Sequence, residues 1–216
     1  MALRVRDSID RLREVTDPLR VELMCAGTHP FARWNQQKVT DKQRYATLID
    51  RTQWWGRQML IYGVHVHVGI EDRDKVLPIM RALLTVFAHL QSLSASSPFW
   101  GGDTTGYASN RALMFQQLPT AGLPFQFPSW DELEQYVGDM QHTGVIDDFT
   151  EVRWDIRPSP RFGTLEVRIM DAQPTVADAL ALGALVHSLL VVVMAHGALD
   201  PRWPRAVPWW IEKENC

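Results

Sequence analysis

The stretch Tyr62–Ile70, which reads YGVHVHVGI, constrains the fold of this chain more than any other segment. Its valines alternate with two histidines, and a strand places every second side chain on the same face. The pattern therefore predicts a strand whose valines face a core and whose imidazoles, His65 and His67, share the opposite face. Two neutral imidazoles side by side can bind a divalent metal, or a metal and a phosphate. The alternative is a half-exposed strand whose polar face happens to contain histidine.

Two later segments, residues 153–157 and 164–171, show the same division into an apolar face and a charged face. The prolines and the glycine between them favour a hairpin or a slightly wider turn. The side chains expected to face the core are Trp154, Ile156, Leu165, Val167 and Ile169. Those on the opposite face are Arg153, Asp155 and Arg157 in the first segment, and Glu166 and Arg168 in the second.

When these three strands pair, the sheet has a helical core on one face and a cationic floor on the other. Arginine makes bidentate contacts to phosphates and carboxylates, while glutamate and histidine are metal ligands. Such a floor suits chemistry on a nucleotide that is bound together with Mg²⁺. The sequence contains no glycine-rich phosphate loop of the Walker type, so side chains on the sheet would have to hold the nucleotide.

Apolar side chains recur at intervals of three and four residues in several longer segments, which predicts helices. The expected helices cover residues 3–16, about 41–59, 71–94, 129–143 and 175–196. The last of these is apolar on most sides, so we expect it to be buried on most of its circumference, within this chain or at a subunit contact. The run Val21–Ala26 predicts a short buried strand. His29, after that run, is either a functional side chain at the strand end or a turn residue.

Residues 99–111 form a long polar segment that contains three glycines. Segments of this length without regular structure are usually functional or disordered. The aromatic side chains among them argue against disorder. We therefore interpret the segment as a lid or binding loop, with Arg111 as a candidate contact for an anion.

Composition narrows the class of protein. The 216 residues have a formal net charge of −3, which gives no general attraction to nucleic acid or to an anionic membrane. Two cysteines form no disulfide framework, and the N-terminus lacks the apolar run of a signal peptide. The uncharged run 179–195 is shorter than the ~20 residues that span a bilayer. We therefore expect a cytoplasmic, single-domain protein without nucleic-acid or membrane partners.

Five segments together identify a family. They are residues 27–31 (GTHPF), 65–69 (HVHVG), 93–98 (LSASSP), 154–160 (WDIRPSP) and 163–171 (GTLEVRIMD). This series resembles the type 2 glutamate–cysteine ligases, also called bacterial carboxylate–amine ligases, and the match extends in order from about residue 20 to 212. The resemblance implies that residues 1–216 form a single, partial domain of the glutamine synthetase-like α+β fold. In that fold a curved, mainly antiparallel sheet has a polar active-site face, and helices pack on its other face.

The resemblance also implies a reaction and a set of site residues. The expected enzyme is an ATP- and Mg²⁺-dependent ligase that joins the γ-carboxylate of glutamate to the amine of cysteine through an acyl phosphate. The implied metal ligands are His65 and Glu166. His67 is expected beside the nucleotide phosphates, and Arg157 and Arg168 are expected as catalytic residues on phosphate or substrate carboxylate. With the candidate Arg111, the expected nucleotide-binding set is His67, Arg111, Arg157 and Arg168.

Several expectations concern partners and completeness. The expected partners are small molecules, namely glutamate and cysteine or another amine, and a second copy of the chain in a homo-oligomer. The opening strand of the family, with the pattern Gly-x-Glu-x-Glu, has no counterpart here, so we expect a truncated or internal part of an enzyme. One alternative is a non-catalytic remnant that binds a nucleotide or a partner. Another is a metal hydrolase using His65, His67 and a carboxylate, although no third ligand stands at a recognisable spacing.

Overall fold

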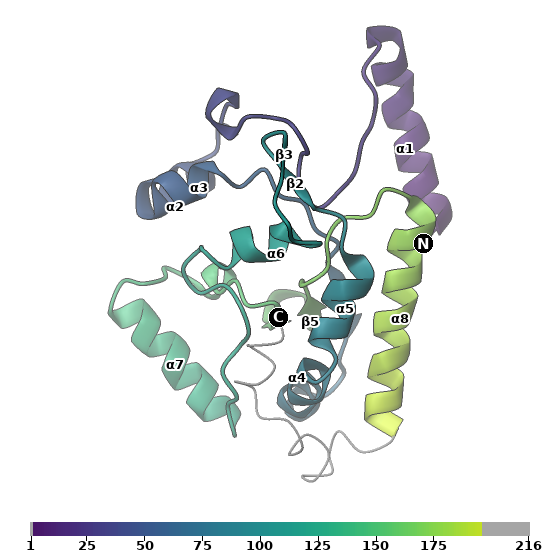
Figure 1. Cartoon of the computed structure of the whole chain (residues 1–216). Coiled ribbons are helices and arrows are strands. Elements are labelled where there is room, and N and C mark those ends of the chain that lie inside the picture. Colours follow the sequence, from purple (N-terminus) through teal and green to yellow (C-terminus); the bar gives the residue numbers. More distant parts are fainter. Residues whose placement is uncertain (1, 196–216) are drawn as a thin grey trace.

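The computed structural model describes residues 2–195 and confirms a mixed α+β fold (Figure 1). A three-stranded antiparallel sheet has the order β1-β5-β4, and a separate short hairpin pairs β2 with β3. The strands are β1 (Val66–Gly69), β2 (Phe99–Trp100), β3 (Asp103–Thr104), β4 (Ile156–Ser159) and β5 (Thr164–Val167). The helices are α1 (Ala2–Thr16), α2 (Gln43–Thr52), α3 (Trp54–Arg57), α4 (Val76–Leu84), α5 (Phe87–Ser94), α6 (Asn110–Phe115), α7 (Trp130–His142) and α8 (Val176–Ala195).

The three alternating segments pair as predicted. β5 is the central strand, and its Glu166 stands opposite His67 of β1 on one side and Arg157 of β4 on the other. A single 3-10 turn, Pro160–Phe162, joins β4 to β5 and ends at Gly163, whose φ of 61° is one that glycine adopts without strain. The register therefore gathers the charged side chains on one face of the sheet.

The opposite face of the sheet forms the core together with α4 and α8. The valines of β1 and the apolar side chains of β4 and β5 pack against these helices, as the alternation predicted. Trp154, just before β4, is 2% exposed and packs its ring against Phe127 and Tyr136. Ser129 caps the N-terminus of α7, since its hydroxyl accepts a hydrogen bond from the Glu132 backbone.

We expect Trp154→Ala to lower the free energy of unfolding by about 3–5 kcal/mol, because it removes a large buried side chain and leaves a cavity. Urea unfolding followed by circular dichroism measures the change. The matched control is Trp54→Ala, whose side chain is 54% exposed and whose loss should cost about 1 kcal/mol or less. Equal effects of the two substitutions would contradict the assignment of Trp154 to the core.

Two predicted helices are interrupted. The helix expected over residues 71–94 bends by 64° between α4 and α5. The Thr85 hydroxyl donates to the Ala82 carbonyl there, which competes with the helical hydrogen bonds. The helix expected over residues 41–59 breaks into α2 and α3 at Gln53, which adopts a φ of 50°. Apolar periodicity continues through both breaks, so it could not locate them.

The buried strand predicted for Val21–Ala26 is wrong. These residues form no strand, and Val21 and Met24 are 51% and 56% exposed. Pairing begins only beyond them, where Thr28 bridges Ile61. His29 Nδ1 accepts a hydrogen bond from the Ala32 backbone, which is a contact expected of a turn residue. An apolar run predicts burial, but it cannot supply the neighbouring strand that burial requires.

Helix α8 is less covered than its composition predicted. One side packs on α4, β1 and α1 (Figure 1), but Val191 and Val192 on another side are 53% and 47% exposed. Burial on most of the circumference within this chain is therefore wrong for the described part, and burial at a subunit contact stays a prediction. Among the helices within residues 2–195, only α8 is by itself long and apolar enough to cross a membrane. Core helices of other proteins can be equally long and apolar. His196, the last residue of the predicted helix, lies outside the described residues, as does the tryptophan- and proline-rich stretch 201–210.

Candidate active site

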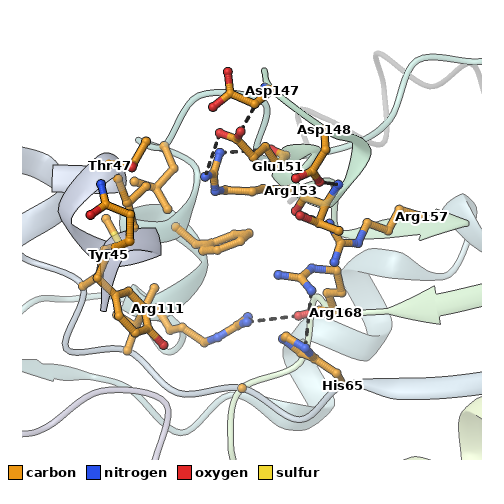
Figure 2. Close-up of a pocket in the computed structure, with 18 residues that line it drawn as sticks. Tyr45, Thr47, His65, Arg111, Asp147, Asp148, Glu151, Arg153, Arg157 and Arg168 are labelled. Carbon is orange, nitrogen blue, oxygen red and sulfur yellow. Dashed lines mark hydrogen bonds and ion pairs between the residues drawn. The ribbon is translucent and has the colours of Figure 1, made fainter. Parts of the chain in front are cut away.

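A cavity of about 620 Å³ opens on the charged face of the sheet. Figure 2 shows His65, Arg168 and Arg157 on one side of it, with Tyr45 and Thr47 of α2 across from them. The remaining charged side chains of its wall are Arg111 of α6, Arg153 before β4, and the acidic residues Asp147, Asp148 and Glu151. The cavity therefore has the volume of a small-molecule site and a strongly charged lining.

Four of the six predicted site residues line this cavity. They are His65, Arg111, Arg157 and Arg168, which come from the position just before β1, from α6, from β4 and from the segment after β5. Of the other two, Glu166 adjoins the cavity through contacts to His65 and Arg157, and His67 in turn contacts Glu166. The sheet register explains the convergence, since Glu166 lies between β1 and β4.

Glu166 is the centre of an ion-pair cluster, and its side chain is only 4% exposed. One carboxylate oxygen accepts from Arg157 Nε at 2.8 Å, and the other accepts from an Arg168 Nη atom at 2.5 Å. Burial by itself raises the pKa of Glu166, but the hydrogen bonds from His65 and Arg157 and the arginine charges outweigh burial and hold that pKa far below its usual range. The Glu166 carboxylate is therefore ionised and holds two arginines in place.

The two histidines have different surroundings. His65 Nδ1 lies 3.2 Å from the Glu166 carboxylate, and burial lowers the pKa of His65 in spite of this contact. His65 is therefore neutral near pH 7, the form in which imidazole binds metals. His67 lies at the rim, where its Nδ1 is 2.9 Å from the Thr164 hydroxyl and its ring meets the edge of Phe162.

Asp155 is a second buried carboxyl group, 2% exposed, and it interacts electrostatically with Arg111 and Arg168. Burial raises its pKa to about 6, an effect that the charges of Arg111 and Arg168 only partly offset. Its Oδ2 has no hydrogen-bond partner among residues 2–195. Asp155 and Glu166 therefore lie in one cationic cluster with pKa values shifted in opposite directions.

We expect Asp155 to make the stability of the fold depend on pH. Its folded pKa of about 6 lies above the ordinary value of 3.8, so the folded chain keeps a proton that the unfolded chain has released. Stability is therefore lost as pH rises from about 4 through 6. Between pH 5 and pH 8 the free energy of unfolding of the unmodified chain should fall by about 1–2 kcal/mol more than that of Asp155→Asn, whose side chain cannot ionise. Urea unfolding of both proteins at the two pH values measures this difference, and identical losses would contradict the shift.

Comparison with known proteins identifies the family. The family model described as glutamate-cysteine ligase family 2 matches residues 1–211. The chain belongs to this family. A relative from Leifsonia xyli subsp. xyli is 58% identical over 212 residues, which are 98% of this chain and 56% of the relative. One from Arthrobacter sp. is 58% identical over 96% of this chain and 54% of its own length.

A relative from Mycobacterium tuberculosis is 56% identical over 98% of this chain and 56% of its own length. All three are provisionally named as glutamate–cysteine ligases 2. The chain spans about half the length of these curated relatives.

The described residues of the chain do not form a complete Mg²⁺ site. No group of three histidine, cysteine, aspartate or glutamate side chains between residues 2 and 195 is arranged to hold a metal ion. Glu166 contributes the carboxylate beside His65 and His67, and both of its oxygens contact arginines. Mg²⁺ prefers six oxygen ligands in octahedral geometry, so two imidazoles and one carboxylate are too few. The metal roles of His65 and Glu166 stay predictions.

Sequence reasoning missed the wall of the cavity that faces the sheet. Tyr45 and Thr47 come from a helix predicted only for its apolar side chains, and Asp147, Asp148 and Glu151 come from a segment without a recognisable pattern. Arg51 of α2 joins the two regions through ion pairs to Asp147 and Glu151 at 2.9 and 2.7 Å. Contacts between residues about a hundred positions apart give no local signal in the sequence.

Proposed function

We propose that the cavity belongs to the active site of an ATP-dependent carboxylate–amine ligase that makes γ-glutamylcysteine from glutamate and cysteine. The observation behind this proposal is the convergence of Arg111, Arg157 and Arg168 with the neutral His65 around one cavity on a sheet face. Membership of glutamate-cysteine ligase family 2 and the provisional names of the relatives support the substrate class. We further propose that the chain is a partial, single glutamine synthetase-like domain.

The proposed reaction has two steps. The γ-carboxylate of glutamate attacks the γ-phosphorus of ATP, the bond to ADP breaks, and an acyl phosphate forms. The amine of cysteine then attacks the acyl carbon, phosphate leaves, and the nitrogen gives up a proton to form the amide. Negative charge accumulates on the phosphoryl oxygens in the first step and on the acyl oxygen in the second.

In this scheme the chain acts by positioning and by electrostatic stabilisation. Arg157 and Arg168 stabilise the charge on the transferring phosphoryl group, and Glu166 holds both guanidinium groups in place. Arg111 binds an anionic substrate group, and His67 at the rim binds nucleotide phosphate. Mg²⁺, when bound, supplies positive charge to the phosphates. His65 and Glu166 are its proposed ligands from this chain, together with phosphate oxygens and water.

A non-catalytic role is the second candidate function. It is favoured by the shortage of carboxylates near His65, because the same arginines bind anions whether or not a metal site is complete. In that case the cavity binds a nucleotide, or a protein partner occupies the site, without turnover. For either function we propose a cytoplasmic protein that assembles with further copies of itself.

Isothermal titration of the chain with ATP, with and without Mg²⁺, tests whether the cavity binds nucleotide. Arg168→Lys keeps a positive charge beside Glu166 but loses the planar fork, and we expect it to weaken ATP binding about tenfold. The control is Arg73→Lys, whose side chain is 64% exposed and remote from the cavity. Release of phosphate that requires both glutamate and cysteine would establish the ligase. ATP binding without such release would establish nucleotide binding without turnover, and the absence of any ATP or glutamate binding would contradict both the ligase and the nucleotide-binding role.

A further inference from the structure

Asp171, four residues after β5, is completely buried and does not belong to the ion-pair cluster around Glu166. Its Oδ2 accepts hydrogen bonds from the Ser97 hydroxyl at 2.6 Å and the Ser96 backbone at 3.0 Å, and its Oδ1 accepts from the Ser109 hydroxyl at 2.9 Å. An ionised carboxylate is an acceptor only, so all three of these bonds match its charged form. Asp171 therefore binds both ends of the segment between Ser97 and Ser109.

The ends of this segment are also joined to one another. The Ser97 backbone donates to Ala108, and the Asn110 backbone donates to Ser97. The Ser97 hydroxyl, which donates to Asp171, accepts in turn from the Arg111 backbone at 3.0 Å. Two successive hydrogen bonds therefore connect the Asp171 carboxylate to the backbone of Arg111.

Hydrogen bonds also fix the guanidinium group of Arg111. It donates to the carbonyls of Ile169 and Arg168 at 3.0 and 3.1 Å, just before Asp171 in sequence, and it lies at the cavity wall (Figure 2). Gly63 leaves room for it, since a Cβ at that position would lie 2.4 Å from an Arg111 Nη atom. Arg111 Nε has no partner within residues 2–195. The side chain is therefore fixed from both ends, and its Nε–H donor is unused within the described residues.

We propose that Asp171 is a positioning residue that acts through Ser97 and Ser109 to hold Arg111 as an anion-binding donor of the cavity. The inference rests on the proposed function for the identity of the anion, which is a substrate carboxylate or a nucleotide phosphate. Gly27 supports the role of Asp171, because a Cβ there would lie 2.5 Å from the Asp171 carboxyl carbon. The chain thus packs its backbone closely around both ends of this connection.

The first test needs no ligand. Asp171→Asn replaces an acceptor oxygen with an amide donor, which faces the hydroxyl and amide donors that Asp171 now satisfies. We expect amide hydrogen exchange in residues 97–111 to become at least about tenfold faster, while exchange in α7 is unchanged, and the Arg111 Nε–H resonance to shift. Ser109→Ala removes one donor only and should give a smaller change in the same direction. Asp178→Asn, at the exposed start of α8, is the matched control.

The second test uses glutamate and inorganic triphosphate as separate probes in titration calorimetry, to distinguish a carboxylate from a phosphate ligand. Asp171→Asn should weaken binding of one probe about tenfold. In the Arg111→Met background the same substitution should weaken it no further, as expected for residues that act as a unit. Equal weakening in both backgrounds would overturn the connection to Arg111, and unchanged exchange in residues 97–111 would overturn the positioning role.

These readouts separate two kinds of failure. If the unmodified chain binds neither probe, the proposed function and the anion role of Arg111 both fail. The positioning role of Asp171 is then decided by hydrogen exchange and by the Arg111 resonance alone. If a probe binds and Asp171→Asn changes neither exchange nor affinity, the proposed function stands and the role of Asp171 is refuted.

Discussion

Replacing Glu166 by glutamine is expected to lower the free energy of unfolding by about 3 kcal/mol, because it leaves two arginines without their counter-charge. The Arg157 and Arg168 side chains are 15% and 12% exposed, so water can replace only part of the lost interaction. Glutamine keeps the shape of the side chain and one acceptor oxygen. Whatever anion binding the chain shows should also fall, since the two guanidinium groups lose the anchor that orients them.

Urea unfolding at pH 7 and titration with ATP measure the two effects of Glu166→Gln. The matched control is Glu134→Gln, which removes an exposed partner of Arg73 and should change stability by about 0.5 kcal/mol or less. If Glu166→Gln is as stable as the control, the ion pairs of Glu166 with Arg157 and Arg168 do not stabilise the fold.

The second large effect concerns turnover. The 216-residue chain assayed alone is expected to form γ-glutamylcysteine at least about 1,000-fold more slowly than a full-length relative. The reason is the shortage of hard oxygen ligands in the described residues, where Glu166 is paired with arginines and no three-residue metal group exists. Losing a single group that stabilises transition-state charge commonly costs a factor of about 10²–10³ in rate.

Mass-spectrometric detection of γ-glutamylcysteine, with ATP, Mg²⁺, glutamate and cysteine all present, measures this rate. The control is the Leifsonia xyli relative, 58% identical to the chain over their shared residues. Supplying the part of that relative which this chain does not match, as a separate polypeptide, should raise metal binding before it raises the rate. A rate of roughly 1 s⁻¹ or more from the chain alone, typical of enzymes, would show that its own residues suffice.

The alternation of residues in three segments was enough to predict the sheet and its two faces. Valine and histidine at every second position in β1, and the matching patterns in β4 and β5, are local properties of a strand. The alternation also excludes a pairing that is shifted by one residue, because that shift would turn the apolar side chains to the charged face. Four of the predicted site residues therefore line one cavity, Glu166 adjoins it, and His67 in turn contacts Glu166. Their metal, nucleotide and catalytic roles stay predictions.

The helix breaks and the exposure of one apolar run depend on tertiary contacts, which the periodicity of the sequence does not describe. Helices predicted as continuous break at Gln53 and at Thr85, because a positive φ and a side-chain hydrogen bond are set by surroundings rather than by apolar spacing. Residues 21–25 of the predicted buried strand are exposed, since burial depends on a covering partner as well as on hydrophobicity.

The same limit applies to the site. The sequence by itself determined which side chains share the charged face, since strand geometry has a fixed period of two. Only the tertiary structure brought α2 and the acidic segment 147–151 to the other side of the cavity, and only it connected Asp171 to Arg111. Those arrangements depend on contacts between residues far apart in the chain, and such contacts leave no periodic signal in a single sequence.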